Sequence, residues 1–280
     1  MTLKPVGPLC QTKDWYDYAP DGLLRRRQAI RPGTLGMASA PSAQGGKKAV
    51  ALGKCSFLNR AKTETVAAPK AVFDRLRGLS GGAKVSAPRP KTSHTWPDGS
   101  RSAAVEQEIA IDGQTIQVTR PTDTDAKGKN LPTTQQLAEA LRAVPADQRL
   151  FTKTVVLSPT PAKGSTPKAT VAGEGGSGEV FLYPLLKKQD QQDFDNRVMH
   201  EAGHNLQGDL WNSGGGQAVV AWGVAAKADD TSPSPYSDGV GQTGDDFCEF
   251  NILYNAAKGT PCEEVAKQIY PQRWAKRESY

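Results

Sequence analysis

The stretch His200-Glu201-Ala202-Gly203-His204 reads H-E-x-x-H, and the rest of the chain is interpreted around it. On an α-helix, residues four apart lie one turn apart on the same face, so both imidazoles can reach one metal ion. The glutamate beside them can reach a water molecule bound to that ion. By chance, this pentapeptide is expected in fewer than about 1 in 100 chains of this size. It therefore predicts a zinc site with His200 and His204 as ligands and Glu201 as the catalytic base.

The residues around this stretch predict an amphipathic helix. Apolar residues recur at steps of four from Phe194 to Leu210 and place an apolar stripe on one side. The two histidines fall on roughly the opposite side, so one face packs and the other carries the chemistry. Gly203 is a poor helix former, which suggests that a neighbouring element approaches closely there.

The ends of this helix are also predicted. Asp190 or Asp193 can cap its N-terminus. We expect it to end near Trp211, before the glycine-rich residues 212 to 216. A separate short helix is expected at about residues 217 to 227.

A catalytic zinc site needs a third protein ligand and an open position for water. No histidine follows His204, and a helix predicted over residues 245 to 257 offers Asp245, Asp246 and Glu249. Asp245 and Glu249 are four apart and share a face, so one can bind the metal while the other orients a histidine ring. We favour Glu249 as the ligand because its side chain reaches further and has apolar neighbours, where an unpaired carboxylate is costly. Asp245 is the alternative.

The C-terminal part of the chain, about residues 179 to 280, resembles the zincin metallopeptidases whose third ligand is a glutamate. H-E-x-x-H is followed by Pro235-Tyr236 and then by Asp245-Asp-Phe-Cys-Glu249. This arrangement is similar to the anthrax-lethal-factor-like peptidases. The tail from Tyr254 to Trp274 is similar to metallopeptidase toxin domains of type VI secretion spike proteins. In the lethal-factor pattern the first acid of the later helix is the ligand, and here that position is Asp245.

The site and the resemblance imply a zinc-dependent endopeptidase. The resemblance further implies that it is a secreted bacterial toxin or effector. Zn²⁺ would lower the pKa of a bound water towards about 7 and polarise the scissile carbonyl. Glu201 would take the proton from that water and pass it to the leaving amine. Tyr236 is a candidate donor to the developing oxyanion, and an ordinary loop tyrosine is the other interpretation. The alternative function is a non-peptidase zincin, a metal-stabilised binding protein with a closed four-ligand site.

The other elements predict an α+β fold, specifically a zincin-like domain in which a small mixed sheet is combined with the active-site helix and C-terminal helices. The expected elements are a helix at 69–77, a hairpin of strands 105–111 and 115–119 around Asp112-Gly113, a helix at 134–144, strands at 151–157 and 179–183, and a last helix after Thr260-Pro261. Strand 179–183 is interpreted as an edge, either one that receives an extended peptide or a purely structural one. We divide the chain into a loop-rich region 1–100, a possible docking or loading segment, and a zincin-like domain 101–280.

Two other features are interpreted as structural. Gly78-Leu79-Ser80-Gly81-Gly82 matches G-x-S-x-G by letter, but a helix precedes it where a nucleophile elbow needs a strand. His94 and residues 158 to 178 are expected in loops.

Composition limits the setting of the protein. The chain has 280 residues, is 37% hydrophobic and carries a net charge of +6. No apolar run approaches the ~18 residues of a membrane span, and the first residues lack a hydrophobic signal core. We expect a protein that is cytoplasmic in its producer, with export by a leaderless route into the periplasm of a target cell as a further expectation. The expected partners are a protein or peptide substrate, secretion machinery and an immunity protein, without nucleic acid, because the basic residues are scattered.

The four cysteines form no C-x-x-C pair, which argues against a zinc ribbon. Pairing of Cys10 with Cys55 and of Cys248 with Cys262 would suit an oxidising compartment. Free buried thiols are an equal alternative.

Overall fold

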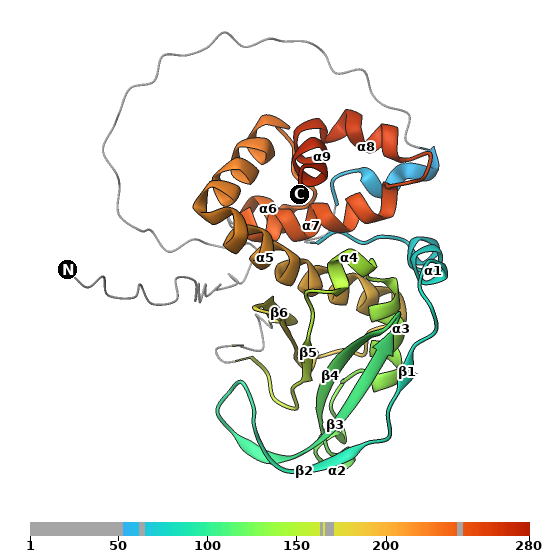
Figure 1. Cartoon of the computed structure of the whole chain (residues 1–280), viewed down its shortest axis with the longest axis vertical. Helices are drawn as coiled ribbons and strands as arrows, with labels where there is room; N and C mark the ends of the chain where they lie inside the picture. The colour runs from blue at the N-terminus through green and yellow to red at the C-terminus, as the bar shows by residue number, and fades with distance from the viewer. Residues whose placement is uncertain (1–52, 62–64, 163–164, 166–170, 240–242) are drawn as a thin grey trace, which may run out of the picture.

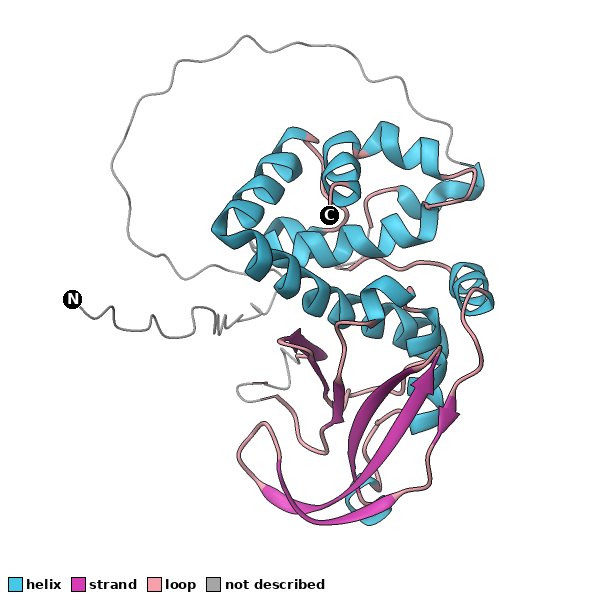
Figure 2. Ribbon diagram, viewed as in Figure 1, coloured by secondary structure: helices cyan, strands magenta, loops and turns pink. Residues whose placement is uncertain are grey.

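The long helix α5 (Gln191–Ala228) runs through the middle of the molecule and carries the H-E-x-x-H stretch. In this computed structural model, which describes residues 53–61, 65–162, 165, 171–239 and 243–280, a β-sheet lies on one side of α5 and the C-terminal helices lie on the other (Figure 1). Figure 2 shows the same division by secondary structure. The remaining elements are η1 (Gly53–Leu58), α1 (Lys70–Gly78), β1 (Lys84–Val85), β2 (Arg89–Thr95), β3 (Arg101–Ile111), β4 (Gln114–Pro121), α2 (Asp123–Ala126), α3 (Thr134–Ala143), α4 (Ala146–Arg149), β5 (Thr154–Leu157), β6 (Gly173–Gly176), β7 (Glu179–Leu182), α6 (Pro235–Gly239), α7 (Thr243–Ala257), α8 (Glu263–Ile269) and α9 (Pro271–Glu278). The predicted α+β class is confirmed.

The sheet is mixed. Its order is β1-β3-β4-β5-β7-β6, with β2 also paired to β3. β5 pairs parallel with β4 and with β7, and the other pairs are antiparallel. One face packs its apolar residues against α3 and α5 in a shared core.

The predicted hairpin is confirmed as β3 and β4. Asp112 and Gly113 form its turn with φ angles of 49° and 80°. Two consecutive positive φ angles fit a tight hairpin turn, and Asp-Gly tolerates them at low cost. Ile109 and Ile116 face each other in the ladder and are both fully buried, which fixes the register.

Strand 179–183 was predicted as an edge, and this prediction is wrong. β7 lies between β5 and β6, so β6 is the terminal strand of this side of the sheet as described. β6 falls inside the range 158–178 that was predicted as loop, because its glycine-rich sequence gives no strand signal.

The predicted helix break at residues 212 to 216 is also wrong. α5 continues without interruption to Ala228 after starting at Asp190, whose side chain accepts a hydrogen bond from the backbone N–H of Asp193. Its second half is anchored by Trp222, which is fully buried and donates from Nε1 to Asp246 Oδ1 at 2.9 Å. Tertiary packing therefore outweighs the low helix propensity of the glycines.

Parts of the expected N-terminal region 1–100 belong to the packed structure. β1 and β2 pair with β3 across the expected division. Buried residues of η1 and α1 join α7 and the C-terminal helices in a second core. Residues 1 to 52, including Cys10, lie outside the described residues.

The cysteine pairings proposed from the sequence are corrected. Cys55 is bonded to Cys262, 207 residues further along the chain, and Cys248 is a free, buried thiol. The bond between Cys55 and Cys262 could not be predicted from the spacing of the cysteines, because these two residues meet only when η1 packs beside α8.

Smaller corrections concern three segments. His94 lies in β2 instead of a loop. The expected last helix is two helices, α8 and α9, separated at Tyr270 and Pro271. Ser80 follows helix α1 and donates to Arg142 O at 2.8 Å, consistent with a helix end. Within the described residues, no helix combines the length and the apolar character of a transmembrane span.

Candidate metal centre

Asp245 of α7 lies close to both histidines of the H-E-x-x-H stretch on α5. Nε2 of His200 and Nε2 of His204 each lie 3.5 Å from Oδ1 of Asp245. In a tetrahedral zinc site with ligand bonds of about 2.1 Å, neighbouring ligand atoms are about 3.4 Å apart. Each of the two nitrogen-to-oxygen separations is close to that spacing. Among the described residues, the three whose ligand atoms all lie within 4.8 Å of one another are His200, His204 and Cys248.

The other nitrogen of each ring is held by the protein. Nδ1 of His200 lies 2.9 Å from Oε1 of Glu249, and Nδ1 of His204 lies 2.9 Å from Oε1 of Gln207. Both partners are acceptors, so each Nδ1 carries the hydrogen of the neutral ring and Nε2 keeps its lone pair. Two lone pairs and a carboxylate oxygen then face one another, an arrangement that needs a proton or a cation between them. This donor set fits a divalent metal, and the acceptors behind the rings are the kind that orient metal-bound histidines.

The geometry favours Asp245 over Glu249 as the third ligand. Glu249 is 1% exposed, and both of its oxygens are engaged: Oε1 with His200 and Oε2 with the backbone N–H of Val66. It therefore occupies the orienting position that the sequence analysis allowed for one of the two acids. The greater length of its side chain lets it reach behind the ring of His200.

Electrostatics at this point favour a positive charge. Burial alone would lower the pKa of His200, but hydrogen bonds to Asp245 and Glu249 outweigh it and raise this pKa well above its ordinary value. Burial likewise opposes ionisation of Asp245, yet the two histidines hold the pKa of that carboxyl below its usual range. Both shifts have the same cause, since a positive charge beside these carboxylates is favourable, and a divalent cation would supply such a charge.

Glu201 lies beside the two histidines and beneath β6. It is 6% exposed, and burial is the main cause that raises the pKa of its carboxyl. A Cβ atom added at Gly173 would meet Glu201 Oε1 at 2.6 Å, and one added at Gly175 would meet the backbone oxygen of Glu201 at 2.1 Å. The glycines of β6 therefore let the strand lie directly on α5 at the candidate base.

Arg197, one turn before Glu201, fastens β6 and β7 to the helix. Its guanidinium donates to Tyr183 O at 2.9 Å and to Ala172 O, just before β6. Burial lowers the pKa of Arg197 to about 10, and the carboxylate of Glu201 opposes this shift. The sequence analysis did not identify this arginine, although its i,i+4 spacing to Glu201 was visible.

Tyr236 is brought close to the cluster. Its ring centroid lies 6.1 Å from that of His200. It was expected in a loop, and the structure places it in the short helix α6. Its role as a donor stays a prediction.

Cys248 is a neighbour that the sequence analysis did not assign to the site. Its Sγ and one nitrogen of each histidine lie within 4.8 Å of one another, so the three residues form a possible metal-binding group. Sγ also lies 3.8 Å from Gln207 Oε1, the oxygen that holds Nδ1 of His204. A Cβ added at Gly203 would meet Sγ at 3.1 Å, which confirms the close approach expected at this glycine.

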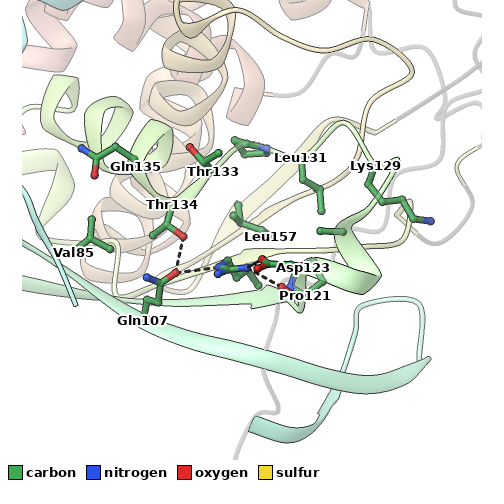
Figure 3. A pocket seen from close by; sticks show the side chains of 13 residues that line it. Val85, Gln107, Pro121, Asp123, Lys129, Leu131, Thr133, Thr134, Gln135 and Leu157 are labelled. Atoms are coloured by element: carbon green, nitrogen blue, oxygen red, sulfur yellow. Dashed lines mark hydrogen bonds and ion pairs between the residues drawn. The ribbon is translucent and has the colours of Figure 1, made fainter. Parts of the chain in front are cut away.

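A separate hollow of about 410 Å³ lies away from this cluster, between β4, α2 and the start of α3 (Figure 3). Gln107 and Thr134 point towards each other there, with the Thr134 hydroxyl donating to Gln107 Oε1 at 2.8 Å. None of the metal-centre residues lines it.

Comparison with known proteins gives no match to a family model, a curated protein or a solved structure. The function is therefore inferred from the geometry of the site.

Proposed function

We propose that the protein is a zinc-dependent endopeptidase of the zincin type. The observation that carries the proposal is the convergence of His200 Nε2 and His204 Nε2 on Asp245 Oδ1, each at 3.5 Å. In this proposal His200, His204 and Asp245 hold the ion, while Glu249 and Gln207 keep the rings in place through Nδ1.

The chain supplies the proton transfer and the binding surface. A bound zinc ion supplies a Lewis acid that polarises the scissile carbonyl and acidifies water. Glu201, next to His200 on the same helix, accepts the proton from the attacking water and delivers it to the leaving amine. Its position under β6 shelters this proton from bulk water, and β6, the terminal strand on this side of the sheet as described, would pair with an extended peptide. Tyr236, whose ring centroid lies 6.1 Å from that of His200, would donate to the oxygen of the scissile carbonyl.

The experiment compares zinc content and proteolysis of the wild type with those of Glu201→Gln. We expect about one zinc per chain in both proteins and cleavage of an unfolded protein substrate by the wild type alone. Loss of a general base lowers the rate by about 10²- to 10⁴-fold. A wild type without stoichiometric zinc, or an equally active Glu201→Gln, contradicts the proposal.

We further propose that this activity belongs to a bacterial toxin or effector that acts in an oxidising compartment such as the periplasm. The disulfide between Cys55 and Cys262 supports this setting. Directing the chain to the periplasm of a test bacterium should inhibit growth, whereas Glu201→Gln should not. Equal inhibition by both proteins would separate toxicity from peptidase chemistry.

The second candidate function is a metal-stabilised binding protein with a closed site. The observation that favours it is Cys248, which lies close enough to both histidines to serve as a further ligand. Cobalt substitution distinguishes the two functions. A closed site with a thiolate ligand gives an intense charge-transfer band that Cys248→Ser removes, whereas the peptidase site lacks this band in both proteins.

A further inference from the structure

A segment before α1 crosses the helices that form the candidate metal centre. We call it the strap and define it as Gly53–Ala61 together with Thr65–Ala68. Its most buried side chains, each at most 8% exposed, lie in the core shared with α7 and the C-terminal helices: Cys55, Leu58, Val66 and Ala68. The strap is thus part of the packed structure.

The first end of the strap is fastened to the C-terminal helices. Cys55 is bonded covalently to Cys262, just before α8. The hydroxyl of Tyr270 donates to the backbone oxygen of Leu58 at 3.2 Å. These contacts fix the strap to the part of the chain furthest from it in sequence.

The middle of the strap holds the region of α6. The backbone N–H of Ala61 donates to Pro233 O at 2.9 Å, and Arg60 forms an ion pair with Asp238. These two partners lie on either side of Tyr236 in the sequence. The strap therefore supports the element that brings Tyr236 towards His200.

The second end reaches the metal centre itself. The backbone N–H of Val66 donates to Glu249 Oε2. Two hydrogen bonds join Ala68 to Asn196 of α5: N–H to Oδ1 at 2.8 Å, and Nδ2 to the backbone oxygen at 3.2 Å. Val66 and Ala68 are 3% and 0% exposed, so water does not replace these partners in the folded chain.

The contact with Glu249 matters because the other oxygen of that carboxylate holds His200. Oε1 lies 2.9 Å from Nδ1 of His200, whose Nε2 faces Asp245. If the strap leaves, a buried carboxylate loses a donor and is free to turn or to take up water. The ring of His200 then loses the fixed acceptor that sets its tautomer and its direction.

We propose that the strap is a positioning element for the metal centre, fastened by the Cys55–Cys262 disulfide, so that zinc binding is tight only in the oxidised protein. This inference rests on the proposed function to the extent that the centre binds zinc. The switch is a two-electron step. A dithiol reductant gives two electrons and two protons to the S–S bond, which becomes two thiols, while the reductant closes to its own cyclic disulfide. An oxidising compartment reverses the step through a disulfide donor of the same chemistry.

The test measures Zn²⁺ affinity of the full chain by competition with a chelating indicator. Cys55→Ser/Cys262→Ser removes the fastening, and Cys10→Ser is its control because it removes a cysteine outside this bond. Val66→Pro removes the N–H donor while the disulfide stays, and Val66→Ala is its control because it keeps the N–H. We expect both strap variants to bind Zn²⁺ about 10- to 100-fold more weakly than the wild type, the range for a lost partner behind a ligating histidine. Both controls should stay within about twofold.

Thermal unfolding establishes which variants are folded. Unchanged Zn²⁺ affinity in the folded disulfide variant or in folded Val66→Pro overturns the proposal. If the disulfide variant does not fold, Val66→Pro alone decides. If neither folds, the zinc-loaded wild type decides: after a phosphine reductant is added, zinc release must precede the change in tryptophan fluorescence, and coincident release overturns the proposal.

Failure of the proposed function gives a different result. A wild type that binds no zinc when oxidised contradicts the metal centre itself. A wild type that binds zinc but cleaves no peptide contradicts the peptidase, while the affinity ratio between the wild type and the strap variants still tests the strap.

Discussion

Each histidine of the candidate metal centre has one nitrogen held by a protein acceptor and the other directed at Asp245. His200 is held by Glu249 and His204 by Gln207, through Nδ1 in both cases. The two acids of α7 therefore have different positions, although they share a helix face. Mutation can distinguish the roles of Asp245 and Glu249, because the loss of a metal ligand lowers zinc affinity more than the loss of a residue that orients a ligand.

We predict that Asp245→Ala abolishes stoichiometric zinc, whereas Glu249→Gln weakens zinc affinity by about 10- to 100-fold. The measurement is a Zn²⁺ competition titration. Asp209→Asn, at an exposed position of α5, is the control and should leave the affinity unchanged. A greater loss in Glu249→Gln than in Asp245→Ala would return Glu249 to the ligand position favoured from the sequence.

Among the elements, β6 and α5 make the closest contact at the site. Gly173 and Gly175 face α5, where an added Cβ would overlap Glu201. At Gly175 the overlap would be with the backbone of α5, which cannot move aside as the end of a flexible side chain can. The fit of the strand on the helix therefore depends on the absence of side chains at these positions.

We predict that Gly175→Ala destabilises the protein by about 1–3 kcal/mol, the cost of overpacking, and lowers any activity by displacing β6. Gly208→Ala is the matched control on α5, because an added Cβ there meets nothing within 4 Å. The control should raise stability by up to about 1 kcal/mol through helix propensity. Urea unfolding checks both values, and equal stability of the two variants would show that β6 does not lie flush on the helix.

The second half of α5 depends on one anchor. Trp222 is fully buried, packs against Phe247 with ring centroids 4.8 Å apart and donates to Asp246. We predict that Trp222→Ala costs about 3–5 kcal/mol. Val220→Ala, at a position that is 65% exposed, should change stability by less than about 0.5 kcal/mol. Denaturant unfolding followed by circular dichroism checks both, and a mild effect of Trp222→Ala would mean that the helix continues without this anchor.

Elements with strong local signals were predictable from the sequence. The Asp112-Gly113 turn predicted the hairpin, and the helix predicted at 134–144 is found as α3. β6 and the continuity of α5 were not predictable, because glycine-rich stretches carry no local preference for the structure they adopt here. In both cases the structure depends on a partner that is distant in sequence. β6 forms where its glycines pack on α5, and the second half of α5 is held by the hydrogen bond from Trp222 to Asp246.

At the scale of the whole molecule, the disulfide joins residues that are 207 positions apart. Closing so long a loop restricts the unfolded chain, and the entropy model assigns it about 5 kcal/mol. We predict that reduction by a phosphine lowers the free energy of unfolding by several kcal/mol, up to this value. Urea unfolding with and without the reductant measures it, with Cys10→Ser as the control. A change below about 1 kcal/mol would contradict the prediction.

Long-range pairings set the limit of sequence reasoning for the whole chain. Four cysteines allow three complete pairings, and spacing does not choose among them. The same limit applies to the third ligand: the sequence placed Asp245 and Glu249 on one face but could not show which ring nitrogen each would meet. The contact of Val66 with Glu249 could not be predicted at all, because it is made by a backbone N–H, which nearly every residue has.

The continuity of α5 has a mechanical consequence. His204 and Trp222 both meet the start of α7, at Asp245 and at Asp246, so α5 changes direction between them while it stays helical (Figure 1). An unbroken helix that is built into both halves joins them directly, even where it bends. We therefore expect the two halves to move together, and solution scattering profiles with and without a tight inhibitor should superimpose.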